Sequence, residues 1–297
     1  MLTRTEMVSQ PMTAAGLTVG AMFLIAVSDN GTPAVAEHIG LWQFHYLRSS
    51  IALAVLAAMA SVLGWSLAPA NWRGVTARGG LHAIAMVIYF GCAAFLPVTQ
   101  VLAALFTAPL FLLLLGVFEG KRPDAGRFGL TLLGFMGCLA VVQPDFSTLG
   151  LISAASFVAA IFYGLGNSVT STWCRDESPW VMVGVYLAIL ALVGAIGLLL
   201  TPGGDSFLTR SWVQPPRHVW FILIGQAVAS LIALAMLTRA YQLATPTFTG
   251  AWEYSVLILA AIVGYVLWGQ TVNFAAVLGI CTILITGFVL ALRGDPT

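Results

Sequence analysis

The chain has 297 residues, of which 60% are hydrophobic and only 8% are charged, and its formal net charge is +1 at pH 7. A soluble domain covers its surface with about 25% charged residues, so this composition excludes an ordinary water-soluble protein and indicates an all-α integral membrane protein. No basic face exists to neutralise phosphates, which excludes nucleic acid as a partner. The lipid bilayer is the first partner that we expect.

Ten stretches of about 20 mostly apolar residues follow one another, each long enough to cross a bilayer. In the first half we expect transmembrane helices at Met12–Gly31, Leu41–Gly64, Gly79–Leu96, Val98–Phe118 and Arg127–Gln143. In the second half we expect them at Leu149–Trp173, Trp180–Leu200, Val219–Tyr241, Thr247–Trp268 and Val272–Leu292. The first stretch resembles a signal peptide, but Ser28, Asp29, Asn30 and Pro33 interrupt it, so we expect it to remain as the first span.

Lysine and arginine gather on one side of this topology, where cytoplasmic loops are expected to be positive. With the N-terminus inside, the cytoplasmic side carries Arg4, Arg73, Arg78, Lys121, Arg122, Arg127, Arg175, Arg239 and Arg293. Only Arg210 and Arg217 fall outside, and Arg48 lies within the second span. We therefore expect both termini in the cytoplasm of a bacterial cell and the chain in its inner membrane, with Arg78 as a solvated loop charge.

An internal repeat divides the chain into 1–146 and 147–297. At one constant shift, Thr99 matches Thr249, Gly129 matches Gly279, and Gly137 matches Gly287. Because each half has five spans, an odd number, the second half must enter the membrane from the opposite side. The prediction is therefore two inverted five-helix repeats with a binding site between them near the midplane. The paired glycines should let the fifth and tenth spans pack closely.

The segment "YQLATPTFTGAWEYSVLILAAIVGYVLWGQTVNFAAVLGICTILITGFVLALR" resembles the closing block of EamA-type carriers of the drug/metabolite transporter superfamily. The matching residues are Ala240, Tyr241, Pro246, Glu253, Tyr254, Gly264, Gly269 and Gly279, with Pro109, Glu119, Gly129 and Gly137 in the first half. The stretch "QFHYLRSS" is similar to a subgroup that includes S-adenosylmethionine permeases. Gln270 departs from the family pattern, which has a Glu near this position. The resemblance implies ten helices in two inverted repeats around a central cavity, and transport of amino acids, metabolites or vitamins.

Glu253 is a single charge in an apolar stretch, between Trp252 and Tyr254. An ionisable group in the membrane costs about 2.5 kcal/mol or more, so it marks a candidate functional site. The carboxylate and its aromatic neighbours could hold a cationic group, or the carboxylate could carry a proton that couples a gradient to transport. Alternatively, Glu253 is a structural acid bonded to a neighbouring helix.

Asp29 and Arg48 form a second candidate, because both lie within a few turns of the outer boundary. They could pair as a clamp or external gate, or Arg48 could hold a substrate carboxylate with two hydrogen bonds. Asn30 and Asn167 occupy related positions in the two halves, and their amides could bind substrate or cap helices.

Gln100 belongs to a small polar stripe that faces either a cavity or another helix. Tyr89 and Tyr163 are pocket walls or packing residues at membrane depth. The scattered cysteines Cys92, Cys138, Cys174 and Cys281 form no CxxC pair, and no HExxH motif is present, so we expect no metal site, disulfide or cofactor.

These features favour a secondary carrier that works by alternating access, and not an enzyme. Its substrate would be a small organic solute that is amino-acid-like, zwitterionic or cationic, or a vitamin such as riboflavin, or S-adenosylmethionine. A proton or substrate gradient would supply the energy, since no GxxxxGK[ST] loop is present to hold ATP. The alternatives are an intramembrane enzyme and a non-transporting receptor or scaffold. A monomer and a homodimer are both compatible with the sequence.

Overall fold

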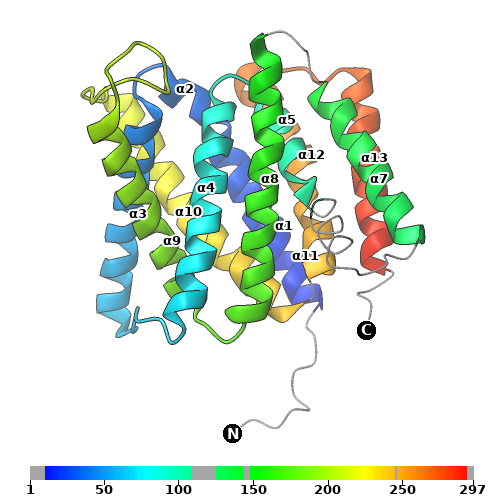
Figure 1. Cartoon of the computed structure of the whole chain (residues 1–297), viewed down its shortest axis with the longest axis horizontal. Helices are drawn as coiled ribbons and strands as arrows, with labels where there is room; N and C mark the ends of the chain where they lie inside the picture. Colours follow the sequence, from blue (N-terminus) through cyan, green and yellow to red (C-terminus); the bar gives the residue numbers. More distant parts are fainter. Residues whose placement is uncertain (1–10, 109–110, 112–124, 144–147, 245, 293–297) are drawn as a thin grey trace, which may run out of the picture.

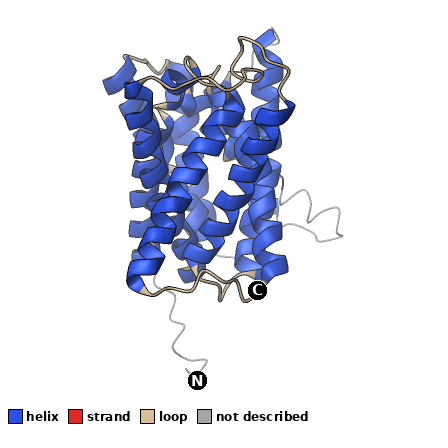
Figure 2. Cartoon of the chain, turned by 90° about the vertical axis from the view of Figure 1, so that its left-hand side faces the viewer, coloured by secondary structure: helices blue, strands red, loops and turns tan. Residues whose placement is uncertain are grey.

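The computed structural model describes residues 11–108, 111, 125–143, 148–244 and 246–292. All regular structure in this part of the chain is helical, and the helices share one general direction with their connections at two ends (Figures 1 and 2). The expected all-α architecture is therefore confirmed. Parts of the predicted fourth span, and the loop charges Glu119, Lys121 and Arg122, lie outside the described residues.

The helices follow in chain order through the bundle (Figure 1). The first group is α1 (Pro11–Asp29), α2 (Thr32–Ala36), α3 (Leu41–Leu63), α4 (Trp72–Ala93), α5 (Val98–Leu105) and α7 (Ala125–Val142). The second group is α8 (Thr148–Trp173), α9 (Pro179–Leu200), α10 (Arg217–Leu243), α11 (Pro246–Glu253), α12 (Ser255–Trp268) and α13 (Phe274–Leu292).

Within the described residues, six helical segments are long and apolar enough to cross a membrane. They are Met12–Ala36, Leu41–Leu63, Trp72–Ala93, Gly150–Trp173, Pro179–Leu200 and Arg217–Leu243. Large apolar side chains also cover the outside of the bundle: Leu199 is 85% exposed and Leu151 is 80% exposed. Such a surface would drive association in water and is suited to lipid. The protein is therefore an integral membrane protein.

Four of the predicted spans are divided or bounded differently in the structure, and in the fourth span of the chain α5 ends at Leu105, where Phe106 and Thr107 form a turn. The first is divided between α1 and α2 around Asn30 and Gly31, just before Pro33, which cannot donate a backbone hydrogen bond. The third begins at Trp72 instead of Gly79, because the Asn71 side chain accepts a hydrogen bond from the Gly74 N–H at 3.0 Å and caps the helix. The ninth is interrupted at Tyr254, between α11 and α12.

The helices pack in characteristic pairs. The strongest associations are α4 with α8, α1 with α10, α3 with α9, and α7 with α13. In the last pair, a Cβ atom on Gly137 would lie 2.9 Å from the Gly279 carbonyl oxygen, so the absence of a side chain sets the spacing. The predicted glycine packing is thus confirmed for Gly137 and Gly279. It is wrong for Gly129, which faces open space, and Gly287 packs against the ring of Tyr254.

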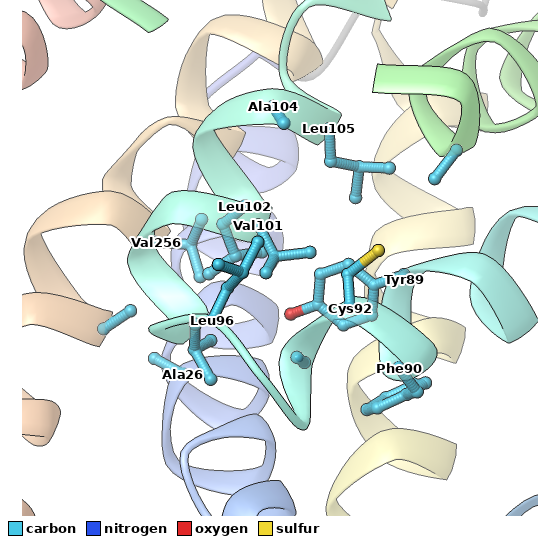
Figure 3. Packing of buried hydrophobic residues seen from close by; sticks show 14 of the residues in the cluster. Ala26, Tyr89, Phe90, Cys92, Leu96, Val101, Leu102, Ala104, Leu105 and Val256 are labelled. Carbon is cyan, nitrogen blue, oxygen red and sulfur yellow. The ribbon is translucent and has the colours of Figure 1, made fainter. Parts of the chain in front are cut away.

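The main hydrophobic cluster lies between the central helices. Figure 3 shows Tyr89 and Cys92 of α4 in one cluster with Leu102 and Leu105 of α5 and Ala26 of α1. Among these side chains, Ala26 is fully buried and Tyr89 is 2% exposed. This cluster holds α1, α4 and α5 together, and the same helices form part of the wall of an internal cavity.

Candidate functional site

A cavity lies inside the bundle, with walls from α1, α3, α4, α5, α8, α9, α10 and α11; the empty space there is about 740 Å³ when the part that opens to the surroundings is included. Its mostly apolar lining with a few convergent polar groups is typical of a small-molecule site. The apolar lining residues are Met22, Ile25, Met86, Phe90, Leu102, Leu105, Phe106, Val183, Leu234 and Leu237. The polar lining residues are Asp29, Arg48, Arg78, His82, Tyr89, Tyr163, Tyr186, Ser230 and Glu253.

Glu253 is the last residue of α11 and is only 2% exposed. Tyr163 of α8 donates its hydroxyl hydrogen to Glu253 Oε2 at 3.0 Å. The other carboxyl oxygen, Oε1, is buried and has no hydrogen-bond partner within 3.5 Å among the described residues, although the Tyr241 hydroxyl lies close enough to interact with the carboxyl group. A buried acceptor left unpaired is costly, so this oxygen is available for a donor from a ligand or for a proton of its own.

Asp29 and Arg48 also line the cavity, but each has a different partner from the one expected. Asp29 accepts a hydrogen bond from the Tyr89 hydroxyl at 2.8 Å, and Arg48 donates from Nε to Ser230 at 3.1 Å. The guanidinium carbon of Arg48 lies 4.5 Å from the ring centroid of Phe90, a cation–π contact. In the described residues these contacts replace the expected direct ion pair between Asp29 and Arg48.

Arg78 is not the solvated loop charge that the sequence predicts. It lies inside α4 and is 5% exposed. Its guanidinium donates to Thr170 at 2.9 Å, to the Met182 carbonyl at 3.3 Å and to Thr238 at 3.1 Å. The expectation failed because α4 begins at Trp72, which places Arg78 well within the helix.

His82 begins a chain of polar contacts behind one wall of the cavity. Its Nδ1 lies 3.0 Å from the Arg78 carbonyl, and its Nε2 lies 3.2 Å from Asn167 Oδ1. Asn167 in turn donates to the Tyr241 hydroxyl at 3.3 Å, and Tyr241 lies beside Glu253. Because a carbonyl oxygen only accepts, Nδ1 carries a proton. His82 Nε2 can donate to Asn167 Oδ1 only when it also carries a proton. Without that proton, Nε2 is an acceptor and the Asn167 amide has to turn its NH₂ group toward it.

The cavity thus brings together five of the residues singled out from the sequence: Glu253, Asp29, Arg48, Tyr89 and Tyr163. Asn167 stands directly behind them through its contacts with His82 and Tyr241.

The other four candidates lie outside the cavity lining. Tyr254 packs against Phe106 with ring centroids 5.4 Å apart, and Asn30 donates to the Ala26 carbonyl at 2.8 Å. Gln100 lines a separate hollow near Gln270, and Trp252 is 37% exposed. Helical geometry explains the two neighbours of Glu253, since adjacent residues on a helix point in different directions.

Several cavity residues were missed by the sequence analysis. Among them are His82, Tyr186 and Ser230, none of which is part of a site predicted from the sequence. A usable signal existed on α4, where Arg78, His82, Met86 and Tyr89 recur at helical spacing and share one face of the helix. Tyr186 and Ser230 offered no comparable pattern, because they come from different helices that only the fold brings together.

Comparison with protein-family models finds no match. The chain is 28% identical to a riboflavin transporter of Vibrio cholerae over 58% of its length, which is 55% of that protein. It is 22% identical to the pseudopaline exporter CntI of Pseudomonas aeruginosa over 89% of its length and 90% of that protein. It is 23% identical to an S-adenosylmethionine uptake transporter of Rickettsia bellii over 66% of each chain.

A solved crystal structure supports the fold. It superposes with a TM-score of 0.69 at 17% sequence identity and covers 96% of this chain and 99% of that chain. Fold and cavity together define a helical membrane protein with an internal cavity. The named relatives are transporters of metabolites or vitamins, and they point to the drug/metabolite transporter type that the sequence resembles.

Proposed function

We propose that the chain is a secondary carrier that moves a small organic metabolite across the bacterial inner membrane by alternating access. The observation that carries this proposal is a cavity inside an apolar bundle with Glu253 in its wall, whose carboxyl oxygen Oε1 has no hydrogen-bond partner within 3.5 Å among the described residues. Intramembrane acids that face a cavity mark substrate or ion pathways. The named transporter relatives agree with this assignment.

The proposed architecture has ten spans in two inverted repeats, 1–146 and 147–297. The packing of the helices supports this symmetry. If each helix is replaced by its counterpart in the other half, the α4–α8 pair becomes the α10–α1 pair, and both pairs are present. The pairs α3–α9 and α7–α13 each consist of two counterparts, so the exchange leaves them unchanged. In Figure 1, α1 runs upward where α8 runs downward. α1 also begins, and α13 ends, at the same end of the bundle, which fits termini on one side; the positive loops favour the cytoplasm.

In the proposed site, Glu253 holds either a proton or a hydrogen-bond donor of the substrate, with Tyr163 orienting its carboxylate. Asp29, Arg48 and Tyr89 bind at another part of the same cavity. Asn167 acts from behind the wall. The substrate is amino-acid-like, zwitterionic or cationic, or a vitamin, and a proton or substrate gradient drives it.

The four remaining candidates, Trp252, Tyr254, Asn30 and Gln100, support the proposed site through helix packing, caps or the neighbouring hollow. This assignment follows from their places outside the cavity lining. The working unit is a monomer or a homodimer, and the proposed cavity lies within one chain in either case.

Glu253→Gln tests the proposal, because it keeps the shape of the side chain and removes its charge and proton. Uptake into proteoliposomes of whichever solute the wild-type protein transports, from a panel of amino acids, riboflavin and S-adenosylmethionine, should fall about tenfold or more, while thermal unfolding in detergent stays near that of the wild type. Glu37→Gln is the matched control, since Glu37 is exposed outside the cavity. Wild-type uptake by the Glu253→Gln protein would contradict the proposal.

A further inference from the structure

Two arginines line the cavity, and their hydrogen bonding differs. Arg78 uses Nε, Nη1 and Nη2, which donate to Thr170, Met182 and Thr238. Arg48 uses only Nε, which donates to Ser230. Within the part of the chain that the structure describes, neither Nη1 nor Nη2 of Arg48 has a hydrogen-bond partner, although the residue is only 9% exposed.

The surroundings of Arg48 leave the N–H groups of these two nitrogens without an acceptor among the described residues. The guanidinium carbon lies over the rings of Phe90, at 4.5 Å, and of Phe44, at 5.5 Å, measured to the ring centroids. Aromatic faces attract the cation without using its N–H donors, and Arg48 belongs to the cavity lining. The edge of a guanidinium group presents N–H donors in a fork that matches a carboxylate or a phosphate.

The nearby Asp29 explains how the cavity tolerates a buried cation. Its negative charge acts on Arg48 through space, while its Oδ2 accepts from Tyr89 and not from Arg48. The charge of Arg48 is therefore partly balanced by Asp29, while its Nη1 and Nη2 donors still have no acceptor among the described residues. A ligand anion can add the missing hydrogen bonds, which a buried charge needs in order to be stable.

We propose that Arg48 is the subsite for an anionic group of the transported solute, a carboxylate or a phosphate. The unpaired Oε1 of Glu253 then receives a hydrogen-bond donor, such as an ammonium group, from another part of the same molecule. This inference rests on the proposed function and narrows it: the substrate carries an anionic group, and a purely cationic solute is excluded. Arg78, in which each of the three guanidinium nitrogens already donates a hydrogen bond, is a structural clamp.

Matched pairs of solutes that differ by one anionic group provide the test. S-adenosylmethionine has a carboxylate that decarboxylated S-adenosylmethionine lacks, and riboflavin 5′-phosphate has a phosphate that riboflavin lacks. We expect the anionic member of at least one pair to bind the purified full chain about tenfold more tightly, measured by equilibrium binding in detergent. The carboxylate pair and the phosphate pair distinguish the two anions.

Variants of Arg48 connect the preference to this residue. In Arg48→Gln the preference for the anionic member should disappear, and in Arg48→Lys, which keeps the charge but loses the fork, it should be reduced. Arg239→Gln is the matched control, because Arg239 is exposed near the C-terminal end of α10 and does not line the cavity. This variant should keep the full preference. The solute pairs also test the wild-type protein alone, so the result does not depend on the folding of a variant.

The outcomes separate this inference from the proposed function. If the wild-type protein transports solutes but binds both members of each pair equally, or if Arg48→Gln keeps the preference, the anion subsite is refuted and the carrier remains. If proteoliposomes with wild-type protein transport none of a panel of amino acids, vitamins and these four solutes, the carrier is refuted and the subsite with it.

Discussion

Arg78 joins four helices through one side chain. From α4 its guanidinium reaches Thr170 of α8, the Met182 carbonyl of α9 and Thr238 of α10. Replacing it with methionine keeps much of the apolar stem but removes three buried hydrogen bonds from a charged donor. A hydrogen bond to a charged group contributes about 1.5–3 kcal/mol, and part of this loss is offset because the buried charge is removed as well, so Arg78→Met should lower the free energy of unfolding by about 1–3 kcal/mol.

The measurement for Arg78 is denaturant or thermal unfolding of the purified protein in detergent. Arg73→Met is the matched control, because Arg73 lies one turn earlier on the same helix and is exposed. An Arg78→Met protein as stable as the Arg73→Met protein would show that the three hydrogen bonds do not hold the helices together.

At this scale the sequence was informative where a charge stood alone in an apolar run. Glu253 and Asp29 were found in this way, and both line the cavity. Arg78 was missed because charges near it in the sequence suggested a loop, and only the Asn71 cap shows where the helix begins. His82 was missed because a histidine without metal-ligand spacing looks unremarkable until the helices around it are placed.

Among the helices, α7 and α13 depend most directly on a glycine contact. A Cβ on Gly137 would lie 2.9 Å from the Gly279 carbonyl oxygen and 3.1 Å from side-chain atoms of Ile283 and Thr282. Gly137→Val should therefore force the two helices apart and cost about 1–3 kcal/mol of stability. Thermal unfolding of the detergent-purified protein measures this effect.

Gly129→Val is the control for that prediction, because Gly129 also belongs to α7 but has no neighbouring atom within 4 Å of a built Cβ. Equal stability of the two variants would argue against close packing at Gly137. Sequence alone could not separate these glycines: both match a glycine in the second half, and only the rotation of α7 against α13 decides which one faces its partner.

Helix bounds show the same limit. Hydropathy located the long segments but not the interruption at Tyr254, because Glu253, Tyr254 and Ser255 are too few polar residues to mark a break in a long apolar run. The interruption matters for the site, since it makes Glu253 the last residue of α11 and directs its carboxylate toward Tyr163.

For the whole molecule, the odd number of spans in each proposed half predicts on which side of the membrane each loop lies. The α3–α4 and α8–α9 connections lie at one end of the bundle, because Asn71 donates its side-chain N–H to the carbonyl of Trp173, the last residue of α8. The α2–α3 and α9–α10 connections lie together at the other end, because Arg210 donates to the carbonyl of Glu37. Inverted halves require these two ends to face opposite sides of the membrane.

Cysteine labelling in intact cells tests this topology. Cys281 is the exposed native thiol and is first replaced by alanine, while Cys92, Cys138 and Cys174 are buried. Single cysteines at the exposed positions Glu37 and Asp205 should then react with a membrane-impermeant maleimide added outside, and cysteines at Ser66 and Asp176 should react only after permeabilisation. Labelling of Ser66→Cys and Asp205→Cys from the same side would mean that the halves are not inverted, because an odd number of crossings separates these positions in the proposed fold.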